Sequence, residues 1–329
     1  MGLRTGVLDH VVSANQFDRP LLDRLFARAA ALEGTRGHSL SGRIMATLFY
    51  EPSTRTRLSF ESAMLRLGGA VVGTEAAYAF SSAMKGETLD DTIRMVCAYA
   101  YVIVLRHDRE GAAAQAAAVA DIPVINAGDG PGEHPTQSLL DLFTIERELG
   151  RVDGLHVAIC GDLRYGRTAR SLARLLALYD GVRISFVAPD VVQMGADVRA
   201  LLEERHVPYT LHDRLDEVIG SADVVYQTRV QKERFTDSAE FEAARGAIRI
   251  DAAVMRLLPP TSIVMHPLPR VDEIAPEVDA DPRAAYFRQA ANGVALRMAL
   301  LELLLALAGC HSRWRADRVS SMRWPWRAP

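Results

Sequence analysis

Apolar and polar positions alternate along this chain in two distinct patterns. Short runs that are apolar at nearly every position predict nine β-strands, at Ile44–Tyr50, Ala70–Gly73, Val102–Leu105, Val124–Ala127, His156–Cys160, Ile184–Ala188, Tyr209–Leu211, Val224–Gln227 and Ile263–His266. Longer stretches with helical periodicity predict helices at Pro20–Leu32, Thr56–Leu67, Thr88–Ala100, an alanine-rich 112–120, Thr136–Leu149, Arg167–Tyr179 and Ala285–Ala308. Several strands are apolar at consecutive positions, which is typical of parallel strands buried on both faces.

The alternation of strands with helices predicts an α/β fold of two doubly wound domains with parallel sheets. A short polar break at Gly150–Gly154 separates the two series of elements. The helix before the break and the last long helix would then cross between the domains and join them. The expected division is residues 1–149 plus 286–310 for one domain, 150–285 for the other, and a disordered tail at 311–329.

The composition narrows the class of protein. The chain has 329 residues, 49% hydrophobic and 24% charged, with a net charge of −3, so no general affinity for nucleic acid or anionic membranes is expected. Cys97, Cys160 and Cys310 are far apart and fit neither a metal site nor a disulfide framework, which favours a reducing cytoplasm. The apolar stretch Met298–Ala308 is too short to span a bilayer, and we find no signal-peptide pattern.

The tail has a composition of its own. It holds all three tryptophans, Trp314, Trp324 and Trp326, and five arginines against one acid, Asp317. Docking to an acidic partner is one interpretation. A disordered extension is favoured, because chain ends are commonly unstructured.

The richest chemical signal follows the first predicted strand, where residues 51–60 read Glu-Pro-Ser-Thr-Arg-Thr-Arg-Leu-Ser-Phe. Three hydroxyls and two guanidiniums stand at the start of a predicted helix, whose first N–H groups lack partners and whose dipole is positive there. Such a set is suited to a phosphate dianion. Capping of the helix explains one hydroxyl but not five groups, so an anion site is favoured over capping alone.

Further polar clusters follow other predicted strands. Arg106 and His107 end a buried strand, at the sheet edge where α/β proteins bind ligands, although a strand end reaching solvent explains them equally well. His134 and Gln137 open a helix and can face one point, where His134 could donate to a carbonyl oxygen and Gln137 could bind an amide. A capping role for His134 is weighed evenly against this. Residues 81–88, with Ser81 and Lys85, could add phosphate ligands or form an ordinary surface loop.

Three clusters belong to the second series of elements. Gly161–Thr168 nearly matches a nucleotide P-loop, with Arg167 in place of the lysine, although an arginine fork is better suited to a carboxylate. Arg229 and Gln231 share one face of an extended chain and form a second candidate carboxylate site, unless they belong to a solvated charged loop. The segment His266-Pro-Leu-Pro-Arg270 either presents fixed backbone carbonyl groups to a ligand or simply terminates the last strand.

Taken in order, these clusters resemble the family of aspartate carbamoyltransferase catalytic chains. The matching segments are Ser-Thr-Arg-Thr-Arg (53–57), Lys-Gly-Glu-Thr (85–88), Arg-His (106–107), Asn-Ala-Gly-Asp-Gly…His-Pro-Thr-Gln (126–137), Gly-Asp-Leu…Tyr-Gly-Arg-Thr (161–168), Thr-Arg-Val-Gln-Lys-Glu-Arg (228–234) and His-Pro-Leu-Pro-Arg-Val-Asp-Glu-Ile (266–274). They span nearly the whole chain except 311–329. The resemblance implies transfer of the carbamoyl group of carbamoyl phosphate to L-aspartate, the committed step of pyrimidine synthesis.

The resemblance also implies roles for individual residues. The catalytic residues would be Arg55, Thr56, Arg106 and His134. Carbamoyl phosphate would be bound by Ser53, Thr54, Arg55, Thr56, Ser81, Lys85, Arg106, His134, Gln137, Pro267 and Leu268. L-Aspartate would be bound by Lys85, Arg167, Arg229 and Gln231, and bridges between the domains on closure would involve Glu51, Arg167 and Arg234.

The same resemblance implies an assembly and a domain assignment. Residues 1–149 plus 286–310 would bind carbamoyl phosphate, and 150–285 would bind aspartate. Ser81 and Lys85 would reach into a neighbouring subunit of a cytoplasmic homotrimer, which regulatory chains or a dihydroorotase could join. No cofactor or metal is expected, because attack of an amine on an activated carbonyl needs positioning and oxyanion donors rather than a protein nucleophile.

Three rival interpretations remain at this stage. An ornithine carbamoyltransferase shares the cradle at 53–57, but it carries Cys where this chain has Pro267, and it lacks the inserted Lys85. A nucleotide-binding switch would use Gly161–Thr168. A scaffold without activity would be expected to lack Arg55, Lys85 or His134, and all three are present.

Overall fold

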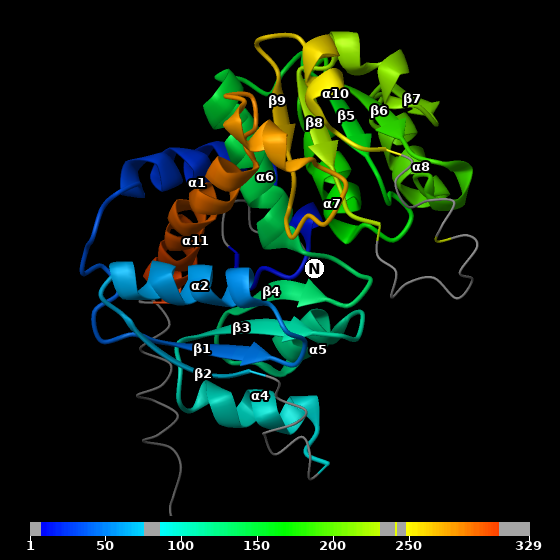
Figure 1. Ribbon diagram of the computed structural model, residues 1–329. Coiled ribbons are helices and arrows are strands. Elements are labelled where there is room, and N and C mark those ends of the chain that lie inside the picture. The colour runs from blue at the N-terminus through cyan, green and yellow to red at the C-terminus, as the bar shows by residue number, and fades with distance from the viewer. Residues whose placement is uncertain (1–7, 76–85, 231–240, 242–247, 309–329) are drawn as a thin grey trace, which may run out of the picture.

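The computed structural model describes residues 8–75, 86–230, 241 and 248–308. Within these residues the chain forms two parallel β-sheets with helices packed on their faces (Figure 1). The strands are β1 (Ile44–Phe49), β2 (Ala70–Glu75), β3 (Val102–His107), β4 (Val124–Asp129), β5 (His156–Cys160), β6 (Arg183–Val187), β7 (Tyr209–His212), β8 (Val224–Gln227) and β9 (Ile263–Met265). The α-helices are α1 (Arg19–Leu32), α2 (Thr54–Arg66), α4 (Leu89–Cys97), α5 (Ala112–Val119), α6 (Pro135–Leu149), α7 (Arg167–Leu176), α8 (Ala196–Glu204), α10 (Ala252–Leu257) and α11 (Tyr286–Ala308). Short 3₁₀ helices lie at Ala14–Gln16, Asp190–Val192, Leu215–Glu217, Ile219–Ser221 and Pro276–Ala280.

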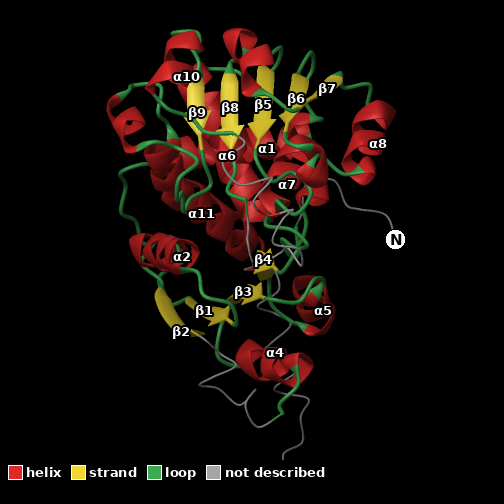
Figure 2. Ribbon diagram, turned by 45° about the vertical axis from the view of Figure 1, so that its right-hand side comes forward, coloured by secondary structure: helices red, strands yellow, loops and turns green. Residues whose placement is uncertain are grey.

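The first sheet has the strand order β2-β1-β3-β4, with every neighbouring pair parallel. Its central strand β1 shows why the sequence there is continuously apolar. Met45 and Phe49 pack into the same core as α2, whereas Ala46 and Leu48 pack with residues of α4 and α5 on the opposite face. Figure 2 shows α2 and α4 on opposite sides of this sheet.

The second sheet has the order β7-β6-β5-β8-β9 and is also parallel throughout. Alternate residues of β5 again serve two cores. Val157 and Ile159 pack into the core that contains α7, while Ala158 and Cys160 share the other core with Met255 of α10. The predicted fold of two α/β units with parallel sheets is therefore confirmed.

Two long helices connect the sheets. α6 follows β4 of the first sheet and ends at Gly150, which takes a left-handed C-cap conformation (φ 70°) that glycine adopts without strain. β5 of the second sheet then begins six residues later. α11 follows the last strand of the second sheet and packs against α1, α2 and α6 (Figure 1).

All nine predicted strands are present, with bounds that differ by at most a few residues. α8 and α10 were not among the predicted helices. α2 begins at Thr54 rather than at Thr56, so Ser53 occupies its N-cap position. None of the helices within the described residues combines the length and the apolar character needed to cross a membrane.

Candidate active site

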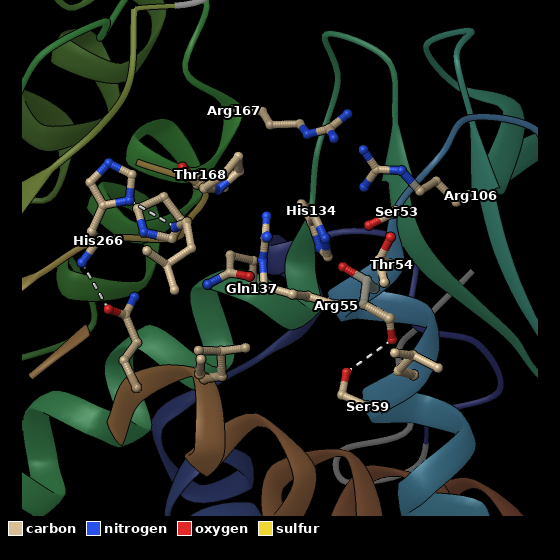
Figure 3. A pocket seen from close by; sticks show the side chains of 18 of the residues that line it. Ser53, Thr54, Arg55, Ser59, Arg106, His134, Gln137, Arg167, Thr168 and His266 are labelled. Atoms are coloured by element: carbon tan, nitrogen blue, oxygen red, sulfur yellow. Dashed lines mark hydrogen bonds between the residues drawn. The ribbon is translucent and has the colours of Figure 1, made fainter. Parts of the chain in front are cut away.

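A pocket of about 920 Å³ lies where the carboxyl ends of β1, β3, β5, β8 and β9 face one another. Its walls come from both sheets and from α2, α6, α7 and α11 (Figure 3). The lining residues include Glu51, Ser53, Thr54, Arg55, Thr56, Arg106, Asp108, His134, Gln137, Arg167, Thr168, Arg229, His266, Pro267, Leu268, Gln289 and Arg297. This is the position at which open parallel sheets bind ligands.

Three helices begin at this pocket. Ser53, His134 and Gly166 are the N-cap residues of α2, α6 and α7, and none of them makes a side-chain capping hydrogen bond. The positive ends of three helix dipoles therefore converge on one space, with their first N–H groups not capped by those side chains. The hydroxyl of Ser53 and the imidazole of His134 do not serve as caps, which removes the simpler interpretation of each.

The charged side chains of the lining reinforce the same polarity. The lining contains five arginines but only two acids, Glu51 and Asp108. Burial lowers the pKa of Arg55 and of Arg106, and it lowers that of Arg297 to about 10, so all three remain cations at neutral pH. A site of this kind is suited to ligands that carry several negative charges.

Arg106 and Arg167 approach each other from the two sheets. Arg106 donates from Nη1 to the carbonyl of Ala127 at 3.1 Å, and Arg167 donates from Nη1 to the carbonyl of Gly130. The carboxylate of Glu51 lies 2.9 Å from Nη2 of Arg106 and 3.9 Å from Nη2 of Arg167. Glu51 thus connects the first sheet to the helix that opens the second unit.

Gly128 lets these two guanidiniums lie side by side. Its φ of 115° is strained for any residue with a side chain. A Cβ there would lie 2.9 Å from Nη1 of Arg106 and 3.1 Å from Nη2 of Arg167. The backbone conformation requires glycine here, and a Cβ would in addition push the two guanidinium groups from these positions.

His134 is neutral in this environment. It is buried, and burial lowers the pKa of its imidazole well below 6.5, with further lowering from the positive charges of Arg167, Arg106 and Arg297. Its Nδ1 lies 3.5 Å from Oγ1 of Thr136. A neutral imidazole can donate one hydrogen bond to a carbonyl oxygen without the cost of burying another cation.

Gln137 has its orientation set by a carboxylate. Its Nε2 donates to Oδ1 of Asp141 at 2.8 Å. Because an ionised carboxylate only accepts hydrogen bonds, the amide nitrogen must face Asp141, which leaves the amide oxygen available as an acceptor for a ligand in the pocket.

The segment 266–269 is held by the side chain of its own first residue. Nδ1 of His266 accepts the N–H of Leu268 at 2.8 Å, and Nε2 lies 2.8 Å from Oε1 of Glu273. Leu268 has a φ of 49° and is followed by a cis peptide bond to Pro269. Pro267 and Leu268 line the pocket.

Four N–H groups of the loop from Gly161 to Gly166 already have acceptors within the protein, unlike those of a P-loop. The N–H of Gly161 donates to Val187, and those of Leu163 and Arg164 donate to Val192. The N–H of Tyr165 donates to Oδ1 of Asp162. Since a P-loop holds phosphates through such groups, this arrangement argues against the nucleotide-binding interpretation.

Two family models match the chain. The carbamoyl-phosphate-binding domain of aspartate/ornithine carbamoyltransferase matches residues 9–147, and the Asp/Orn-binding domain matches residues 153–304. Together they cover most of the chain.

The chain belongs to the aspartate/ornithine carbamoyltransferase family.

Several members of this carbamoyltransferase family are similar to the chain over nearly its whole length. The chloroplastic aspartate carbamoyltransferase of Oryza sativa subsp. japonica is 56% identical over 91% of this chain and 85% of its own length. The aspartate carbamoyltransferase catalytic subunit of Methanocella arvoryzae is 51% identical over 91% of this chain and 97% of its own. The aspartate transcarbamoylase of Trypanosoma cruzi, solved with carbamoyl phosphate and aspartate, has a TM-score of 0.87 and 46% identity over 91% of this chain and 98% of its own.

Some residues expected at this carbamoyltransferase site lie outside the described residues. These are Ser81, Lys85, Gln231 and Arg234, together with the tail 311–329. The other expected site residues, from Glu51 and Ser53 to Pro267 and Leu268, line one pocket.

Asp141 and Arg297 are among the charged residues of the site that were missed from the sequence. Asp141 and Arg297 are buried beneath or beside the pocket, and each interrupts an otherwise apolar helical run. A charge in such a run is the signal that could have found them, because a charge is rarely buried without a partner or a role.

Proposed function

We propose that this chain transfers the carbamoyl group of carbamoyl phosphate to the amine of L-aspartate, giving N-carbamoyl-L-aspartate and phosphate in the committed step of pyrimidine synthesis. The observation that carries the proposal is the convergence of three helix N-termini and five arginines on one pocket, because the two substrates together bring a phosphate and two carboxylates. The names of the relatives support the same substrates.

The phosphate fits the start of α2. Ser53, Thr54, Arg55 and Thr56 line the pocket there, so the hydroxyls, the guanidinium and the first N–H groups of the helix act together on the phosphoryl oxygens. As the C–O bond to phosphate breaks, negative charge grows on the leaving group, and Arg55 stabilises it.

The carbonyl oxygen fits the donors that neighbour the phosphate site. Arg106, Thr56 and the neutral His134 supply hydrogen bonds to the oxygen that becomes negative when the amine of aspartate attacks the carbonyl carbon. The amine proton leaves with the departing phosphate in this scheme. The oxygen of Gln137 and the carbonyls of Pro267 and Leu268 accept hydrogen bonds from the carbamoyl NH₂ group.

Arg167 and Arg229 bind the carboxylates of aspartate in this proposal, with Gln231 and Lys85 completing the set. Residues 1–149 plus 286–310 bind carbamoyl phosphate, and residues 150–285 bind aspartate. On closure, Glu51, Arg167 and Arg234 draw the two domains together. Glu51 and Arg167 already approach each other in the structure.

A homotrimer with shared sites is the assembly we propose, with Ser81 and Lys85 reaching into the neighbouring site. In support of this assembly, β2 is an edge strand of the first sheet, and residues 76–85 come directly after it in the sequence. Large apolar side chains are exposed at this edge of the sheet: Val72 of β2 is 48% exposed, and Leu65 of α2, which packs on β2, is 60% exposed. A second copy packed on this edge would bury them. Light scattering that gives the mass of one chain would contradict the proposal.

The cytoplasm is the compartment we propose, on the basis of three scattered cysteines. Relatives from rice and pea are named as chloroplastic proteins. Fractionation of the source cells with an antibody to the chain distinguishes the two.

The test of activity is a carbamoylation assay on the purified chain with carbamoyl phosphate and either L-aspartate or L-ornithine. We expect product with aspartate only, because the cationic side chain of ornithine would lie among Arg167 and Arg229. Product with ornithine alone would replace aspartate with ornithine as the substrate. No product with either amino acid would contradict the proposed reaction.

A further inference from the structure

A buried polar network lies beneath the pocket, and its centre is Asp141 on α6. The side chain of Asp141 is fully buried. Its Oδ1 accepts from Nε2 of Gln137 at 2.8 Å and from Nε2 of Gln289 at 2.6 Å, and its Oδ2 accepts from the hydroxyl of Tyr226 at 2.6 Å. The network therefore joins α6, α11 and β8.

The network reaches the pocket at two places. One is Gln137, which lines the pocket directly. The other is reached through Gln289, whose Oε1 accepts the backbone N–H of His266 at 2.8 Å (dashed in Figure 3). His266 in turn accepts the N–H of Leu268. A single chain of hydrogen bonds thus connects Gln137 to the segment that carries the carbonyls of Pro267 and Leu268.

The chemistry of the carboxylate decides which way each amide points. An ionised carboxylate has no proton to donate, so both glutamines must present their NH₂ groups to Asp141. With one N–H of each amide directed at Asp141, the oxygen of Gln289 accepts the N–H of His266. The oxygen of Gln137 is left to act, with the carbonyls of Pro267 and Leu268, as a hydrogen-bond acceptor on this side of the pocket.

The charge of Asp141 persists under ordinary conditions. Burial raises its pKa to about 6, while the hydrogen bonds from Tyr226, Gln289 and Gln137 and the positive charge of Arg297 oppose the rise. The groups that face it from the packed elements are these three donors and that guanidinium. At pH 8 the side chain is a carboxylate, and the directions of the amides follow from it.

We propose that Asp141 and Gln289 are positioning residues that fix a wall of hydrogen-bond acceptors in the pocket, so that the site selects the NH₂ group of its carbamoyl substrate. A primary amide has two protons for such a wall, whereas a methyl group has none and leaves the acceptors unpaired. The inference rests on the proposed function for the identity of the substrate, and it goes further by assigning the selectivity to the residues that hold the acceptors in place.

The test compares two ligands that differ only in this group. Acetyl phosphate carries CH₃ where carbamoyl phosphate carries NH₂, so the ratio of their dissociation constants measures the acceptor wall alone. We would measure both by calorimetry at pH 8 for the wild type, Asp141→Asn and Gln289→Met. Gln289→Met serves as the second variant because Asp141→Asn can fail to fold.

Thr144→Val is the matched control. Oγ1 of Thr144 accepts from Nδ2 of Asn292 at 3.0 Å, so this pair also joins α6 to α11 and is also buried, but neither residue lines the pocket. The control therefore measures a general loosening of the two helices without disturbing the acceptors.

We expect the wild type and Thr144→Val to prefer carbamoyl phosphate over acetyl phosphate by the same factor. In Asp141→Asn and Gln289→Met, carbamoyl phosphate should bind at least about 10-fold more weakly, as expected for a buried hydrogen bond lost to a misdirected amide. Acetyl phosphate should change less than about threefold, so the preference falls. Equal weakening of both ligands, or an unchanged ratio in both variants, would overturn the inference.

The binding measurements test the role of Asp141 and Gln289 independently of the proposed reaction. A wild-type chain that prefers carbamoyl phosphate but forms no product with aspartate would refute the reaction and leave the role of Asp141 intact. A wild-type chain that forms the product while its Asp141→Asn and Gln289→Met variants keep the full preference would refute the role and leave the reaction intact.

Discussion

The buried carboxyl of Asp141 should make the stability of this chain depend on pH in a way that Asp141→Asn abolishes. In the folded chain its pKa is raised from 3.8 to about 6, chiefly by burial. The folded state therefore holds this proton more tightly than the unfolded state does. The resulting contribution to stability is fully present below about pH 3.8 and is lost as the pH rises through 6.

The size of the effect follows from the shift. About two pKa units at 1.36 kcal/mol each give roughly 3 kcal/mol. The unfolding entropy of a chain of 329 residues is about 0.7 kcal/mol per kelvin, so this free energy corresponds to roughly 4 °C in the unfolding midpoint.

The assay is thermal unfolding of the wild type and Asp141→Asn in parallel from pH 7.5 down to pH 4. Carboxylates whose pKa is lowered by ion pairs, such as Asp153 and Asp279, make both proteins less stable in acid, and they cancel in the difference. We expect the midpoint of the wild type to rise by about 4 °C relative to the variant as the pH falls. A constant offset would refute the raised pKa, and a relative fall in acid would mean that Arg297 dominates and the carboxylate is favoured instead.

Three further predictions concern the pocket. Gly128→Ala should lower kcat/KM for both substrates by about 10- to 100-fold, because a Cβ displaces Arg106 and Arg167 together; kinetics that change for one substrate alone would contradict this. His134 should remain neutral from pH 9 down to pH 6, so the ¹⁵N shifts of its ring should not titrate in that range, and a midpoint near 6.5 would show that burial does not lower its pKa. Arg55→Ala and Lys85→Ala chains should each be inactive but regain part of the activity when they are mixed, and no recovery on mixing would contradict shared sites.

Most of the fold could be predicted because it follows from local pattern. β1, β3 and β5 are apolar on consecutive residues since each buries two faces, and that pattern is visible in the sequence without any knowledge of neighbours. The helices that escaped prediction lack such signals. α10 has only six residues, and α8 has nine and is preceded by Gly195 rather than by a side chain that caps it.

The candidate site, too, could be predicted only where its residues carry a local signal in the sequence. Many of the residues that line the pocket were predicted from short segments that place hydroxyls, arginines and histidine after strands. Asp141 was not, because its role depends on Tyr226 and Gln289, which are 85 and 148 residues away in the sequence. A charge in an apolar helix indicates that a partner exists, but only the packing of α6 against α11 and the second sheet identifies it.

The position of α11 has a consequence for how the protein is made. The apolar surfaces of α1, α2 and α6 on which it packs are complete on the ribosome once residue 149 has been added, but the helix that covers them starts at residue 286. At about 5–20 residues per second, the intervening synthesis takes roughly 7–27 s. The first unit therefore stays unfinished, with core side chains open to chaperones or to other nascent chains, until almost all of the described chain has been translated.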